Sequence, residues 1–118
     1  IALAEYLHAL VLDHDELAPM AEPGLSITCF RYVPSDLAGR VDADDYLDHL
    51  NERIMFELQL GGRVFPSNAT IGGRFALRTC VVNFRTEAST MDLVVDETVR
   101  LGRSLDAELR PTTLRVRG

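Results

Sequence analysis

Lysine and tryptophan are absent from this 118-residue sequence, and cysteine occurs only twice. All 12 basic residues are arginine, so the chain offers no lysine for a Schiff base to a carbonyl cofactor. Cys29 and Cys80 both lie in apolar runs, where free cysteine behaves as a small hydrophobic residue. So few cysteines cannot make a disulfide framework, and they predict a reducing, cytoplasmic compartment.

Long apolar runs and an excess of positive charge are also missing. No run approaches the roughly 20 apolar residues that a membrane-spanning helix needs, so no membrane partner is expected. The net charge of −6 disfavours a nucleic-acid partner, because neutralising phosphates needs a basic face. Residues 1–62 hold 12 acidic residues and 3 arginines, and residues 63–118 hold 6 and 9. This asymmetry predicts two solvated faces of opposite sign that could serve for docking.

The residues that are present are typical of one soluble globular domain. The apolar fraction of 47% and the charged fraction of 25% are ordinary values for such a domain. Since 118 residues can bury a real core, residues 1–118 are predicted to form a single domain. The chain starts with Ile1, and an amphipathic helical pattern from Leu3 to Val11 begins without a capping residue. We therefore expect this domain to follow a further segment of a larger protein.

Hydrophobic periodicity and turn residues divide the rest of the chain into strands and helices. Gly72-Gly73 is typical of a two-residue hairpin turn. The predicted elements are a strand at 25–33, a helix at 42–61, strands at 63–71 and 74–84, a helix at 89–105 and a last strand at 112–117. This β-α-β-β-α-β order predicts the α+β class, with a ferredoxin-like, four-stranded, mostly antiparallel sheet and helices on one face.

Capping and turn residues predict where these elements begin and end. Asp42 is a predicted N-cap of the middle helix, and Ser89 or Thr90 is one for the last helix. Gly61-Gly62 is expected to end the middle helix in a left-handed conformation. Pro66 cannot donate a hydrogen bond to a strand ladder, so its strand is predicted to lie at an edge of the sheet.

The strand at 74–84 is apolar on both of its sides. Its apolar residues are Phe75, Leu77 and Val81 on one side and Ala76, Cys80 and Val82 on the other. A sheet with helices on one side normally alternates apolar and polar residues. We therefore expect a partner subunit or another domain to cover the second face.

The segment from His8 to Glu16 holds several side chains of the types that bind metals. They are His8, Asp13, His14, Asp15 and Glu16. Their spacing matches neither a zinc site nor an EF-hand loop, so a solvated helix end is favoured over a metal site. His49 stands among acidic residues of the middle helix and is expected at the surface rather than as a catalytic base.

Arg78 is the most informative charged residue, because it stands in the least polar strand of the chain. A guanidinium keeps its charge, so a buried one needs a carboxylate or several carbonyl oxygens. Arg78 could form an ion pair within its own chain, or it could face a cleft and receive an anionic ligand. Arg31, in the middle of the strand at 25–33, has the same two interpretations.

Four runs of residues are informative when they are taken together. They are Leu25-Ser26-Ile27-Thr28-Cys29-Phe30-Arg31-Tyr32, Leu50-Asn51, Gly62-Arg63-Val64-Phe65-Pro66-Ser67 and Phe75-Ala76-Leu77-Arg78-Thr79-Cys80-Val81-Val82-Asn83. With these runs in this order, the chain resembles the C-terminal domain of group II pyridoxal-phosphate-dependent amino-acid decarboxylases. The resemblance covers about residues 1–110. This group includes the aromatic-L-amino-acid, histidine, glutamate and diaminobutyrate decarboxylases.

The resemblance implies the small domain of a fold-type I enzyme whose large domain lies upstream. In that family the large domain carries the lysine that binds pyridoxal 5'-phosphate, the aspartate beside the pyridine nitrogen and the histidine over the ring. The absence of lysine here agrees with this division, and the 118-residue chain alone is expected to be inactive. The complete enzyme is expected to be a cytoplasmic homodimer that acts on a small amino-acid substrate.

The implied function is the decarboxylation of an L-amino acid, with the small domain closing the active site. Arg78 matches the arginine of the family's F-x-x-R strand, which in some members contacts the substrate carboxylate. Arg78 is therefore the expected substrate-binding residue, and no catalytic, cofactor-binding or metal-binding residue is expected in this chain. Leu77-Arg78-Thr79 differs from the more aromatic strand of the glutamate enzymes, which disfavours glutamate as the substrate.

Two other interpretations fit the predicted architecture. One is a free-standing ferredoxin-like module with a binding or regulatory role that dimerises through its uncovered sheet face. The other is the small domain of a different fold-type I enzyme, such as an aminotransferase or a desulfurase. The uncapped first helix favours a piece of a larger enzyme over the free-standing module.

Overall fold

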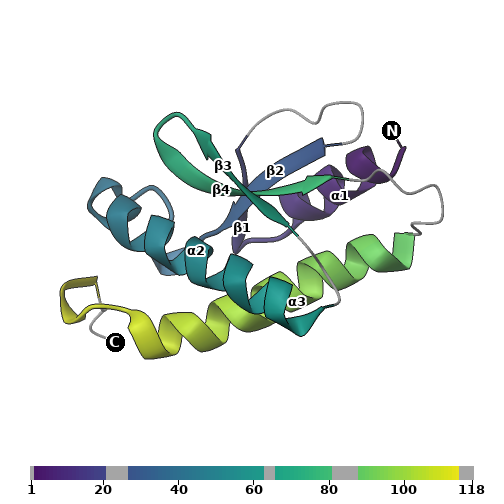
Figure 1. The fold of residues 1–118 in the computed structure, drawn as a ribbon. Coiled ribbons are helices and arrows are strands. Elements are labelled where there is room, and N and C mark those ends of the chain that lie inside the picture. Colours follow the sequence, from purple (N-terminus) through teal and green to yellow (C-terminus); the bar gives the residue numbers. More distant parts are fainter. Residues whose placement is uncertain (1, 21–26, 63–65, 81–87, 115–118) are drawn as a thin grey trace.

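The computed structural model describes residues 2–20, 27–62, 66–80 and 88–114 (Figure 1). Its helices and strands are α1 (Ala2–Asp13), β1 (Leu17–Pro19), β2 (Ile27–Tyr32), α2 (Asp44–Gly61), β3 (Ser67–Ile71), β4 (Arg74–Cys80) and α3 (Ala88–Leu109). The described part also contains the 3-10 helices η1 (Ser35–Leu37), η2 (Val41–Ala43) and η3 (Thr112–Leu114). The strands form one four-stranded sheet in which every pair is antiparallel, so the predicted α+β class is confirmed.

The strands lie in the order β1-β2-β4-β3. β3 and β4 form the predicted hairpin, in which Ile71 lies opposite Arg74. The two turn residues, Gly72 and Gly73, have φ angles of 58° and 79°, which glycine adopts without steric cost. Among the described strands β3 pairs only with β4, so the strand that follows Pro66 is an edge strand of this sheet, as predicted.

The other edge of the sheet differs from the prediction. A ferredoxin-like order needs a last strand beside the first one, and this strand was predicted at 112–117. Residues Thr112–Leu114 form η3 instead, so the prediction is wrong there, and residues 115–117 lie outside the described residues. The edge beside β2 is taken by β1, in which Leu17 lies opposite Tyr32. β1 is only three residues long and ends in Pro19, so no periodic pattern marks it as a strand.

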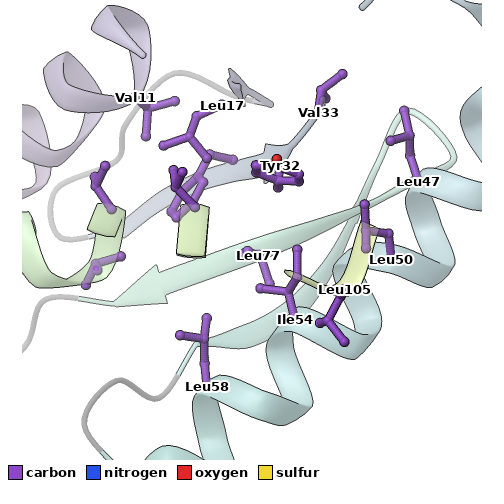
Figure 2. Close-up of a cluster of buried hydrophobic side chains, with 14 of the residues drawn as sticks. Val11, Leu17, Tyr32, Val33, Leu47, Leu50, Ile54, Leu58, Leu77 and Leu105 are labelled. Carbon is purple, nitrogen blue, oxygen red and sulfur yellow. The ribbon is translucent and has the colours of Figure 1, made fainter. Parts of the chain in front are cut away.

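One hydrophobic core lies between the sheet and the helices (Figure 2). Phe30 and Tyr32 of β2 and Leu77 of β4 are almost completely buried in it. The predicted inner side of α2 is confirmed, and its buried residues are Leu47, Leu50, Ile54 and Leu58. Helix α1 adds Leu7 and Val11, and α3 adds Met91, Val94, Val95, Val99 and Leu105. Because all three helices share this core, they cover the same face of the sheet (Figure 1).

The helix ends follow the prediction only in part. Gly62 follows α2 with a φ of 74°, so the predicted left-handed end is confirmed. The predicted N-cap at Asp42 is wrong, because α2 begins after Ala43 and Asp42 forms an ion pair with Arg40. α3 begins at Ala88, so Ser89 and Thr90 lie inside the helix and do not cap it.

Candidate functional site

The sheet has one face packed on the helices and one face that no described helix covers. Successive side chains of a strand point to opposite faces. Since Phe30 and Leu77 point into the core, their neighbours along the strands point away from it. We call this second surface the open face. Its central residues are Cys29 and Arg31 of β2 and Arg74, Ala76 and Arg78 of β4, of which Cys29, Arg31 and Ala76 are buried.

Arg78 stands at the centre of the open face. Its Cα lies opposite Cys29 of β2 on one side and opposite Ser67 of β3 on the other. The residue is half-buried. Within the described ranges no hydrogen bond or ion pair joins its guanidinium to another side chain. The described part of the chain thus holds no internal ion pair for Arg78, which leaves the anion-binding interpretation open for it.

Cys29, opposite Arg78, is buried and has a free thiol. Burial raises the pKa of this thiol, and the nearby charge of Arg78 lowers the pKa by a smaller amount. The thiol therefore stays protonated near neutral pH and packs as a small hydrophobic residue, as predicted from the sequence. The side chain of Cys80 lies outside the described residues.

Arg31 is the buried arginine of the open face, with an exposed fraction of only 7%. Its Nη2 lies 3.7 Å from Oδ1 of Asp44, and Nη2 of Arg74 lies 3.4 Å from Oδ2 of the same aspartate. The Nε and Nη1 atoms of Arg31 are buried without a hydrogen-bond partner among the described residues. Burial lowers the pKa of the Arg31 guanidinium, Arg74 lowers it further, and Asp44 and Asp48 raise it. Arg31 thus has only part of the pairing that a buried guanidinium needs.

Side chains of helix α2 replace part of the backbone hydrogen bonding between β2 and β4, at the end of the open face where Arg31 and Arg74 lie. β2 and β4 pair from Ile27 to Phe30 and then separate. Beyond that point the Asn51 side chain accepts from the Tyr32 N–H at 2.7 Å and donates to the Tyr32 carbonyl at 3.0 Å. The Phe75 N–H donates to Asp48 at 2.9 Å. Two side chains of α2 therefore satisfy backbone groups that a continuous ladder would have paired.

The acidic segment after α1 lines a shallow hollow on the helical side of the molecule. This hollow has a volume of about 310 Å³, and Asp13, His14, Asp15, Glu16, Ser35 and Arg103 line it. Glu16 accepts hydrogen bonds from Arg103 at 2.9 Å and from the Tyr32 hydroxyl at 3.2 Å. Among the described residues, no three or more histidine, cysteine, aspartate or glutamate side chains are grouped so that they could hold a metal ion.

Two further predictions concern the exposure of His49 and the presence of membrane-spanning helices. His49 is exposed on α2, as predicted. A search of the described helices finds none with both the length and the apolar character needed to cross a bilayer.

The sequence gives the two arginines of the open face the same two interpretations, and the structure shows that they differ in burial. Arg31 is buried and only partly paired, whereas Arg78 is half-buried. The role of Asn51 was missed, although this residue sits among the buried residues of α2, immediately after Leu50 and four residues after Leu47. A polar residue on the buried side of a helix is the signal that could have found it, because it must have a hydrogen-bond partner.

The relatives of this chain are amino-acid decarboxylases. The chain is 26% identical over 81 residues to tyrosine decarboxylase 4 of Petroselinum crispum, which covers 69% of this chain and 16% of that protein. It is 28% identical over 91 residues to the aromatic-L-amino-acid decarboxylase of Bacillus atrophaeus, which covers 77% of this chain and 18% of that protein. No protein-family model matches the chain.

The fold is also that of a decarboxylase domain. The structure of Oryza sativa TDC with PLP and tryptamine matches 89% of this chain with a TM-score of 0.77 and 20% identity. The matched part is 22% of that protein, so the chain spans about a fifth of the length of its relatives. The resemblance to group II decarboxylases that the sequence predicts is confirmed, and the shared region has the α+β fold.

Proposed function

We propose that this chain is the small domain of a pyridoxal-phosphate-dependent L-amino-acid decarboxylase, and that Arg78 binds the substrate's α-carboxylate. The observation that carries the proposal is the position of Arg78 on the open face, where no described side chain pairs with its charge. A guanidinium matches a carboxylate through two parallel hydrogen bonds, so it can fix both the position and the orientation of the leaving group. The decarboxylases among the relatives of this chain support the reaction class.

Arg78 would act by orientation rather than by bond-making. Pyridoxal phosphate supplies the electron sink for loss of the carboxylate as carbon dioxide. Holding that carboxylate in one orientation removes rotational freedom before the reaction, which is a substantial part of many enzymes' rate enhancement. The chain contains no lysine, so the covalent anchor of the cofactor has to lie outside it. The chain alone is therefore expected to be inactive.

The remaining parts of the proposal concern the complete protein. A large cofactor-binding domain covers the open face, and the small domain closes the active-site cleft. This is supported by the length of the relatives, since the chain spans 16% to 22% of them. Assembly as a homodimer and a cytoplasmic location belong to the same proposal, and the low cysteine count supports the location.

The test uses the complete product of the gene that encodes this chain. The purified protein is mixed with pyridoxal phosphate, its visible absorbance is recorded, and carbon dioxide release is measured with aromatic amino acids and glutamate. The proposal predicts a yellow protein that releases carbon dioxide from an aromatic amino acid and less from glutamate. Amino-group transfer without carbon dioxide would favour the aminotransferase alternative. A colourless protein that takes up no cofactor would remove the proposed function and favour a free-standing binding module.

A further inference from the structure

Arg31 has hydrogen-bond donors that nothing in the described structure satisfies. The residue is 93% buried, since its exposed fraction is 7%. Its Nε and Nη1 atoms have no hydrogen-bond partner, and Nη2 lies 3.7 Å from Asp44, which is beyond hydrogen-bonding distance. A buried guanidinium cannot lose its charge, so leaving its donors unmet is unfavourable unless another acceptor arrives.

The charges around Arg31 predict that the missing acceptor is anionic. Arg31, Arg74 and Arg78 all point to the open face, and Asp44 is the described carboxylate that forms ion pairs there. Asp44 is shared between Arg31 and Arg74, so it compensates only one positive charge. The nearby Asp48 accepts from the Phe75 N–H and adds a second negative charge near Arg31, so two carboxylates lie near the three arginines. The open face therefore carries an excess of positive charge that a carboxylate would balance.

We expect the acceptor to come with a polypeptide rather than from solution. Nε and Nη1 are shielded from solvent, so a freely diffusing anion has no open route to them. Side-chain rotamers at an interface commonly change on binding, so a segment that packs onto the sheet can bring an acceptor to these atoms. About four-fifths of the Oryza sativa TDC chain lies outside the region that matches this chain, which leaves ample polypeptide to cover this face.

From these observations we propose that Arg31 anchors the open face to the rest of the enzyme by binding an aspartate or glutamate carboxylate of the covering polypeptide. This inference rests on the proposed function, because it assumes the covering domain. It separates the roles of the two arginines: Arg78 receives the substrate, and Arg31 holds the domain that closes over the substrate.

The test compares variants of the complete enzyme by amide hydrogen exchange. The variants are Arg31→Met, which removes the charge, and Arg31→Lys, which keeps the charge but loses the shape of the guanidinium. Arg74→Met is the matched control, because Arg74 lies on the same face and shares Asp44 but has a half-exposed side chain. Glu22→Gln and Glu87→Gln are included because these two acids of the chain lie outside the described residues.

The proposal predicts that Arg31→Met speeds exchange by about tenfold or more in β2 and β4 and also in the segment that covers them, because an unpaired buried carboxylate weakens docking. Arg31→Lys has a smaller effect of the same kind, and Arg74→Met exchanges like the wild type. If Arg31→Met does not fold, the exchange rates of Arg31→Lys alone test the proposal.

Three results would overturn the proposal. They are wild-type exchange in both Arg31 variants, faster exchange confined to this domain, and the same effect in Glu22→Gln or Glu87→Gln. Amide hydrogen exchange does not depend on catalytic activity, so the two proposals can fail separately. A protein without decarboxylase activity can still show the predicted exchange, and an active decarboxylase can lack it.

Discussion

The backbone of Gly102 on α3 lies directly against the ring of Tyr32 on β2. A Cβ at position 102 would come within 2.7 Å of the ring atoms Cγ, Cδ1 and Cδ2, closer than any ordinary contact. Tyr32 has little freedom to move, because Asn51 holds its backbone and Glu16 accepts from its hydroxyl. The absence of a side chain at Gly102 therefore sets how closely α3 approaches the sheet.

Replacing Gly102 with alanine is expected to destabilise the domain. Alanine favours a helix over glycine by about 1 kcal/mol, but overpacking of a filled core costs about 1–3 kcal/mol. The difference between the two effects is a net loss of up to about 2 kcal/mol, and we expect the upper part of that range because the Tyr32 ring has little room to move. Thermal unfolding of the complete protein measures it. Ser104→Ala, at an exposed position of the same helix, is the control and should leave stability unchanged or slightly raised.

A second prediction concerns the amide of Asn51. Asn51→Leu keeps the size of the side chain but leaves the buried N–H and carbonyl of Tyr32 without partners. Since each unsatisfied buried group costs about 1–3 kcal/mol, we expect a loss of roughly 3 kcal/mol in the free energy of unfolding. Glu52→Gln, one residue along on the exposed side of α2, should change stability little. Equal stability of Asn51→Leu and the wild type would contradict the role of Asn51 as a substitute for a strand.

A third prediction concerns acid. The guanidinium of Arg110 binds the carboxylates of Asp36 and Asp106, which ties η1 to α3. The hydrogen bond from Arg110 lowers the pKa of Asp36 below its ordinary value of 3.8. The unfolded chain then binds more protons than the folded one in acid. The stabilisation by Asp36 is therefore fully present above pH 3.8 and is lost as the pH falls through the lowered pKa.

Asp36→Asn should remove part of this pH dependence. We expect the variant to be less stable than the wild type near neutral pH, and the difference between the two to shrink as the pH falls below about 4. Thermal unfolding of both proteins across that range measures it. Asp45→Asn, at an exposed position of α2, is the control. A constant difference between Asp36→Asn and the wild type at every pH would show that the Asp36 carboxylate does not contribute through its charge.

Local sequence signals predicted most of the fold. The helical patterns of α1 and α2, the hairpin at Gly72-Gly73 and the edge position of β3 follow from periodicity, glycine and proline, which act within a few residues. β1 could not be predicted in this way, because Leu17–Pro19 is a strand only through its pairing with β2. Propensity and periodicity say nothing about such a short segment.

The candidate site was predictable only as a set of arginines. An arginine in an apolar strand is visible in the sequence, so Arg78 and Arg31 could both be identified. Their burial could not, because it depends on where α2 begins and where β2 and β4 separate. Asp44 and Asn51 decide those positions through contacts between residues far apart in the chain. Such contacts are set by tertiary packing and not by local pattern.

The kinetics of Arg78 variants in the complete enzyme test the central claim most directly. If Arg78 orients the substrate carboxylate, Arg78→Ala lowers kcat/KM about 100-fold or more, because small losses of alignment cost that much. Arg78→Lys should recover part of the activity, and Arg74→Ala should stay near the wild-type value. Cofactor absorbance and thermal unfolding should be unchanged in all three. A near-normal kcat/KM for Arg78→Ala, in a protein that binds the cofactor and releases carbon dioxide, would contradict the account.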